Sequence, residues 1–136
     1  KIQLCNPSPS SWGQGGFHDY WLNKSNAWIV HEWSKAGREM VSISSEGIKE
    51  ESSIKIIKQA ARELLLSQSS DWSFILKAGT TTELARERIN LHLKRFWILI
   101  NAIKDNKIIN PSLLEEIEKE DCIFPLICPI DWKKKL

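Results

Sequence analysis

Residues 81–104, TTELARERINLHLKRFWILINAIK, are the stretch of sequence that decides the fold. Apolar side chains and one histidine recur there at spacings of three and four, which places them on one face of a helix. This stripe consists of Ala85, Ile89, His92, Phe96, Leu99 and Ile103. The Thr-x-x-Glu pattern of Thr80 and Glu83 predicts a capping box at the start of the helix. We therefore expect a helix over about residues 81–104.

Two further amphipathic segments come before this helix. Residues 27–43 predict a first helix, with Asn26 as its cap. Its expected buried face is Trp28, Val30 or His31, Ala36 and Met40. Residues 52–68 predict a second helix, with a stripe of Ile54, Ile57, Ala61, Leu64 and Gln68. Strand-like alternation is weak, so we expect an all-α fold, an antiparallel three-helix bundle over residues 26–106.

The two ends of the chain differ from this bundle. Residues 1–25 are rich in proline, glycine and tryptophan and predict an irregular N-terminal loop segment. Within residues 107–136, Asn110 and Pro111 predict the cap and first position of a short helix. The remaining proline-broken tail is apolar, and we expect it to pack on the bundle.

Composition excludes several classes of function. The formal net charge of the 136 residues is +2, too small to predict nucleic-acid binding. The apolar runs are far shorter than a bilayer span, and no signal-peptide pattern opens the chain. The three cysteines form no CxxC motif, which favours free thiols in a reducing cytoplasm over a disulfide framework or a zinc site. The chain begins at a lysine in mid-pattern, and we expect it to be a piece of a longer protein.

The candidate binding residues are aromatic. Trp12, Tyr20 and Trp21 lie in the glycine-rich opening segment, where exposed rings would stack on sugars. The alternative is that these rings only pack on the bundle. Asp71 and Trp72 lie at a break between helical segments. There the carboxylate would either accept hydrogen bonds from sugar hydroxyls or simply cap a helix, with the tryptophan packed beside it.

Motifs that would carry other chemistry are incomplete. Glycines 13, 15 and 16 follow no strand and precede no Lys-Ser/Thr pair, so a phosphate loop is not predicted. His31 and Glu32 begin an HExxH motif, but Lys35 stands in place of its second histidine. His92 lies on an apolar stripe and favours a core position. No pair of acids stands out as a couple for glycoside cleavage, so we expect no catalytic residue in this chain.

Several blocks resemble glycoside hydrolase family 57, in the helical region that follows its catalytic barrel. The blocks are SWGQGG at 11–16, WLN at 21–23, ELLLSQSSDWSFI at 63–75, AR at 85–86 and HLKRF at 92–96. Their combination and order are specific, although each alone is modest. The pattern is most similar to the branching-enzyme type of the family.

This resemblance implies an α-1,4-glucan substrate and an upstream catalytic barrel in the same polypeptide. The barrel would carry a glutamate nucleophile and an aspartate general acid, and the helical domain would supply cleft tryptophans. By position, Trp12 and Trp21 match those tryptophans, and Asp71 with Trp72 falls where a polar group meets substrate. Phe17 departs from the tyrosine often found there. No cofactor or metal is implied, and this chain alone would be inactive.

Two other functions stay open beside branching. One is a stand-alone helical module that binds carbohydrate or another partner without chemistry. The other is the same domain in an α-amylase or a 4-α-glucanotransferase of the family. Acids on barrel strands upstream would separate the enzyme from the module, and the linkages of the product would separate the enzymes.

Overall fold

The computed structural model describes residues 3–47 and 50–133, and every regular element in these ranges is helical. The α-helices are α1 (Ala27–Ser45), α2 (Glu51–Ser67), α3 (Ser70–Ala78), α4 (Thr82–Lys104) and α5 (Pro111–Glu120). Two 3₁₀ turns, η1 (Gln14–Gly16) and η2 (Pro129–Trp132), lie near the ends. The predicted all-α class is confirmed.

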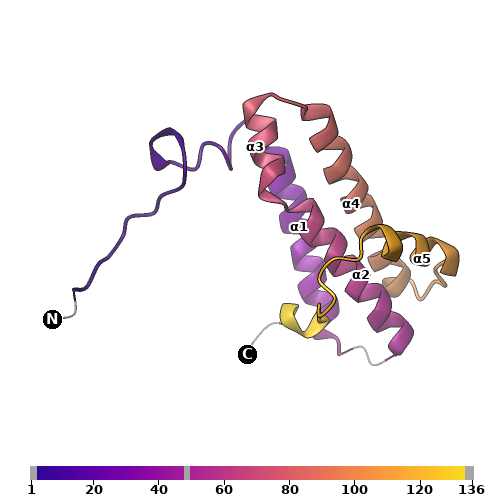
Figure 1. Cartoon of the computed structure of the whole chain (residues 1–136). Coiled ribbons are helices and arrows are strands. Elements are labelled where there is room, and N and C mark those ends of the chain that lie inside the picture. Colours follow the sequence, from indigo (N-terminus) through magenta and orange to yellow (C-terminus); the bar gives the residue numbers. More distant parts are fainter. Residues whose placement is uncertain (1–2, 48–49, 134–136) are drawn as a thin grey trace.

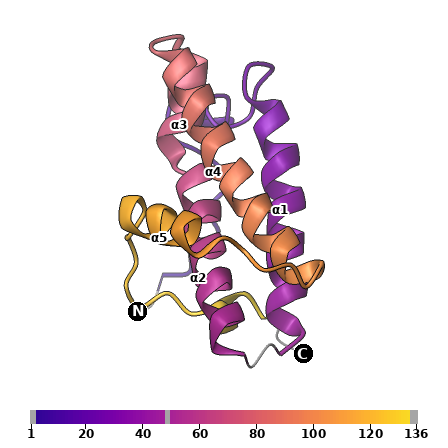
Figure 2. The same ribbon diagram turned by 90° about the vertical axis from the view of Figure 1, so that its right-hand side faces the viewer.

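Three long helices form the frame of the bundle. Helices α1, α2 and α4 run in alternating directions, and α3 continues α2 toward the end where α4 begins (Figure 1). Helix α4 packs mainly on α2, and α1 lies against both of them. Helix α5 crosses α2, and η2 closes against α1 and α2 (Figure 2). This arrangement matches the predicted antiparallel bundle and adds α3 to it.

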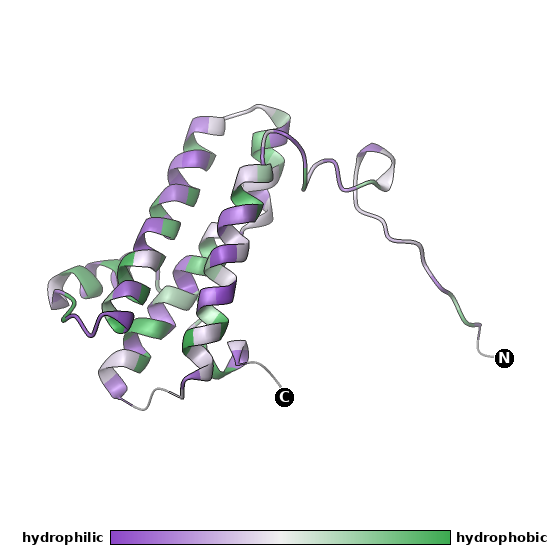
Figure 3. Ribbon diagram, turned by 180° about the vertical axis from the view of Figure 1, so that it is seen from behind, coloured by the Kyte–Doolittle hydropathy of each residue, from purple (hydrophilic) through white to green (hydrophobic). Residues whose placement is uncertain are grey.

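The core lies where the apolar stripes of the helices meet. Figure 3 shows apolar residues along the inner sides of the helices and polar residues on their outer sides. The five residues that the stripes mark most clearly are all buried, as predicted: Ile57, Leu64, Ile89, Phe96 and Leu99. The Phe96 ring also packs edge-on against Trp97, with ring centroids 5.0 Å apart.

Several local expectations were wrong. The buried face of α1 begins at Ile29, because Trp28 is only half buried and donates its indole N–H to the Ser25 carbonyl. Thr81, and not Thr80, precedes α4, and its left-handed backbone (φ 47°) makes no side-chain capping bond. The predicted capping box is therefore absent. Gly79 follows α3 in the left-handed conformation, with φ 78°, which is common for a glycine at the end of a helix.

The C-terminal part follows the prediction in its helix and departs from it in its tail. Asn110 accepts a hydrogen bond from the Ser112 amide at 3.0 Å, as expected of a cap before Pro111. Of the apolar tail residues, Ile127 is buried and Trp132 packs partly on the core. The others stay exposed, against the expectation: Ile123, Phe124, Leu126 and Ile130. Apolar composition alone does not say which of these residues meets the bundle.

Candidate functional site: an aromatic loop on α3

Three aromatic rings join the N-terminal loop to the bundle. The Tyr20 ring stacks on Phe74 of α3, with centroids 5.2 Å apart and planes 13° apart. The Trp12 ring leans on both, at 5.4 Å from Tyr20 and 5.9 Å from Phe74. Trp12 nevertheless remains 66% exposed. The indole is therefore held by two neighbouring rings while most of its surface stays exposed to solvent, as a residue that stacks on a ligand requires.

Hydrogen bonds close the loop around Trp12. The Ser11 amide donates to the Gly16 carbonyl, and the Gly16 amide donates to the Gly13 carbonyl, both at 2.9 Å. The Ser11 hydroxyl accepts from the His18 amide at 2.7 Å. Gly13 has a φ of 79°, and a Cβ there would lie 2.9 Å from the Tyr20 ring. Only glycine fits this position, so the glycine of the motif serves the packing of Tyr20 beside Trp12.

Polar contacts attach the same loop to α3. Asn26 is fully buried, and its Nδ2 donates to the Tyr20 carbonyl at 3.1 Å and to the Ser73 carbonyl at 3.4 Å. Its Oδ1 accepts from the Asn23 amide at 2.8 Å, so Asn26 holds the loop and does not cap α1 with its side chain. Outside the bundle core, Asp19 pairs with Lys77 at 2.5 Å.

The four predicted site residues lie on two segments, with Trp12 and Trp21 in the N-terminal loop and Asp71 and Trp72 in α3. Trp12 is exposed in the ring cluster, and Trp21 is half buried in the turn where its amide bonds the His18 carbonyl. Asp71 is exposed in the first turn of α3 and accepts from the Ser69 hydroxyl at 3.3 Å. Ser69 occupies the cap position of α3, so the alternative prediction that Asp71 caps a helix is wrong.

Trp72 differs from the other three predicted site residues because its side chain packs against the core of the bundle. Its indole N–H donates to the Leu66 carbonyl at 2.9 Å, and its ring packs partly on the core. These contacts anchor the corner between α2 and α3. Because Asp71 and Phe74 lie on the same short helix, the Trp12 ring and the Asp71 carboxylate share α3 as their base.

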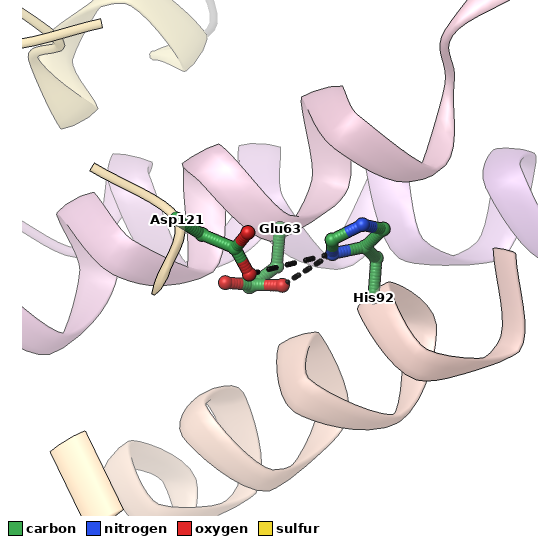
Figure 4. A group of neighbouring side chains, drawn as sticks. All are labelled: Glu63, His92 and Asp121. Carbon is green, nitrogen blue, oxygen red and sulfur yellow. Dashed lines mark hydrogen bonds and ion pairs between the residues drawn. The ribbon is translucent and has the colours of Figure 1, made fainter. Parts of the chain in front are cut away.

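A second cluster of polar side chains is buried between α2 and α4. Nδ1 of His92 lies 2.8 Å from Oε2 of Glu63 and 3.6 Å from Oδ2 of Asp121, which follows α5 (Figure 4). Gln59 donates to the other Glu63 oxygen at 2.8 Å, and Arg95 donates to Asp121 at 2.7 Å. Burial raises the pKa of Glu63, and hydrogen bonds from His92 and Gln59 partly offset that effect.

The donor atoms of Glu63, His92 and Asp121 lie within 4.8 Å of one another, close enough to suggest a metal site. Their partners fit a cation poorly. The Arg95 guanidinium already supplies positive charge to the Asp121 oxygen that faces His92, and both Glu63 oxygens have hydrogen-bond partners. The arrangement is an ion-pair network that fastens the end of α5 to α2 and α4.

Sequence reasoning missed Phe74, Asn26 and the Glu63 network. Phe74 follows Asp71 by three residues, so its place in the site had a local signal in the helical spacing. Asn26 has the composition of an ordinary cap, and nothing in the sequence shows that it bonds Ser73. Glu63 is next to the stripe residue Leu64, and a buried acid at this position needs a partner such as His92. The sequence of neither helix indicates the register in which the two helices pack, so this pair could not be predicted.

The fold and the site define the class of this protein. It is an all-helical domain with a glycine-rich loop, on which an aromatic ring is held by two other rings and remains exposed to solvent. A family model described as "1,4-alpha-glucan branching enzyme, C-terminal" matches residues 32–132. The chain belongs to this family, as the resemblance in its sequence implied.

Relatives of known structure agree with this assignment. The 1,4-alpha-glucan branching enzyme TK1436 of Thermococcus kodakarensis is 35% identical over a match of 118 residues, and the match covers 84% of this chain and 18% of that protein. The GH57-type branching enzyme of Pyrococcus horikoshii superimposes with a TM-score of 0.85 at 30% identity, covering 93% of this chain and 25% of the other. The alpha-amylase AmyC of Thermotoga maritima gives 0.80 at 29% identity, covering 100% and 24%. The chain thus spans a quarter or less of the length of these relatives.

Proposed function

We propose that this chain works as the C-terminal domain of a 1,4-α-glucan branching enzyme and that Trp12 stacks on its glucan substrate. The Trp12 indole carries the proposal, because two rings support it while it stays 66% exposed. An apolar ring face held open to water is costly for a packing residue and useful for binding the flat side of a sugar.

Trp21 and Asp71 extend the proposed surface. Trp21 follows Tyr20 directly in the loop, and Asp71 precedes Phe74 on α3, so both start from elements that hold Trp12. The exposed Asp71 carboxylate would accept hydrogen bonds from glucan hydroxyls. Trp72 would contribute only to the edge of this surface. Its indole N–H already donates to the Leu66 carbonyl and is therefore not free to bind a sugar hydroxyl.

The catalytic acids would lie on a barrel in the rest of the polypeptide. Branching there cleaves an α-1,4 linkage with retention, and the enzyme-bound chain passes to a 6-hydroxyl of another glucan. The TK1436 branching enzyme, solved in complex with glucose and additives, superimposes on this chain with a TM-score of 0.83 at 30% identity over 24% of its length, which supports the assignment to a branching enzyme. This reaction would place the protein in glycogen synthesis and in the cytoplasm. In the described ranges no helix is long and apolar enough to cross a membrane.

The AmyC relative favours hydrolysis of α-glucans as the second candidate. Linkage analysis separates the two. The full-length protein is incubated with amylose, and proton NMR measures α-1,6 linkages and reducing ends in the product. New α-1,6 linkages at a constant number of reducing ends support branching. New reducing ends without α-1,6 linkages would support an amylase. Linear chains of altered length, measured by chromatography, with neither new reducing ends nor α-1,6 linkages, would support a 4-α-glucanotransferase.

A further inference from the structure

We propose that Tyr20 and Phe74 are positioning residues that set the place and tilt of the Trp12 indole. This inference rests on the proposed glucan contact of Trp12. It assigns the two rings beneath that contact a role in binding, although neither ring needs to touch the substrate itself.

The contacts of the loop converge on less than two turns of one helix. The Tyr20 ring stacks on Phe74, Asn26 bonds the Ser73 carbonyl, and Lys77 pairs with Asp19. Ser73, Phe74 and Lys77 are positions i, i+1 and i+4 of α3. The loop is therefore mounted on α3, which Leu76 fixes to the bundle core at 4% exposure.

Among these contacts, only the rings reach Trp12 itself. The Trp12 centroid lies 5.4 Å from that of Tyr20 and 5.9 Å from that of Phe74, tilted by 55° and 48°. Without neighbouring rings in contact with it, an indole that is 66% exposed has many rotamers open to it. The Tyr20–Phe74 stack restricts that choice before substrate arrives, and this preorganisation lowers the cost of binding.

Gly13 shows that the loop is built around this stack. A Cβ at Gly13 would approach two Tyr20 ring carbons at 2.9 and 3.0 Å. The backbone beside Trp12 thus lies against the Tyr20 ring, and the same ring lies flat on Phe74. Movement of Phe74 would pass through Tyr20 to both the backbone and the side chain of Trp12.

A double-mutant cycle on the full-length enzyme tests the inference. The variants are Trp12→Ala, Phe74→Leu and their combination, with kcat and KM measured on amylose. Phe74→Leu removes the flat ring and keeps an apolar side chain. We expect kcat/KM to fall about five- to tenfold, mainly through KM, as for the loss of well-ordered stacking. In the Trp12→Ala background the same change should have no further effect.

Three comparisons make the result decisive. Phe74→Tyr keeps the ring and should restore most of the kcat/KM that Phe74→Leu loses. Phe124→Leu replaces an exposed ring of the tail by leucine and should leave kcat/KM at the parent value. If Phe74→Leu does not fold, Tyr20→Leu removes the other ring of the stack and should give the same loss. An effect of Phe74→Leu that persists without Trp12, or no effect while Trp12→Ala is impaired, overturns the inference. Normal kinetics of Trp12→Ala would instead overturn the proposed function.

Discussion

His92 of α4 and Glu63 of α2 meet inside the bundle, with Nδ1 and Oε2 2.8 Å apart and the glutamate side chain fully buried. The pair joins the two helices that pack most extensively on each other. Asp121 and Arg95 extend it to the end of α5. The network therefore couples the stability of the frame to the placement of the C-terminal segment.

Stability should depend on pH through Glu63. Burial raises its pKa above the ordinary value of 4.5, so the folded chain keeps a proton that the unfolded chain has released. The free energy of unfolding should then fall as pH rises from about 4.5 through the raised pKa. Glu63→Gln removes this titration. Urea unfolding of the 136-residue chain at several pH values should show the parent losing stability relative to the variant as pH rises. A parent that keeps or gains stability relative to the variant as pH rises would contradict the assignment.

Phe96→Ala tests the core. The ring is fully buried and packs on Trp97, so its loss leaves a cavity between α4 and its neighbours. We expect a loss of about 3–5 kcal/mol in the free energy of unfolding. Leu84→Ala, at a residue that is 48% exposed on the same helix, is the control and should cost much less. Equal losses for the two variants would refute the placement of Phe96.

Much of this framework could be predicted from the sequence. The stripe from Ala85 to Ile103 and the pair Asn110-Pro111 carry local signals, and the helices lie where those signals put them. Thr81 takes a left-handed backbone that no capping pattern indicates. Contacts between distant segments, such as Asn26 with Ser73 or Glu63 with His92, depend on the register of helices and could not be predicted. For the same reason the sequence indicated Trp12 and Tyr20 as candidate rings but did not indicate that both would contact Phe74.

Asp71→Asn tests the polar part of the proposed surface. The substitution keeps the shape of the side chain and removes its charge, which weakens hydrogen bonds from sugar hydroxyls. In the full-length enzyme we expect kcat/KM on amylose to fall roughly tenfold, equivalent to about 1.4 kcal/mol. The melting temperature should fall only slightly, because Asp71 is exposed and contributes to α3 through its place in the first turn and not as the cap. Asp105→Asn, at another exposed acid, is the control, and identical kinetics for all three proteins would remove Asp71 from the site.

The 136-residue chain alone should not cleave or branch glucans. Of the acids described here, Glu63 and Asp121 come together, but they are held by His92, Gln59 and Arg95 inside the bundle. Incubation of the purified chain with amylose should leave reducing ends and α-1,6 linkages unchanged. New reducing ends or branches, above those made by a heat-inactivated sample, would show that the chain contains an active site.

The most direct measurement is the rate of α-1,6 linkage formation by the full-length enzyme with Trp12→Ala. If the open indole binds glucan, kcat/KM should fall roughly 5- to 150-fold, the range expected for about 1–3 kcal/mol of lost stacking. The melting temperature should change little, because the ring is 66% exposed. Phe124→Ala, at a ring that is 50% exposed in the tail, should keep the parent rate. A folded Trp12→Ala enzyme that forms branches at the parent rate would contradict the account.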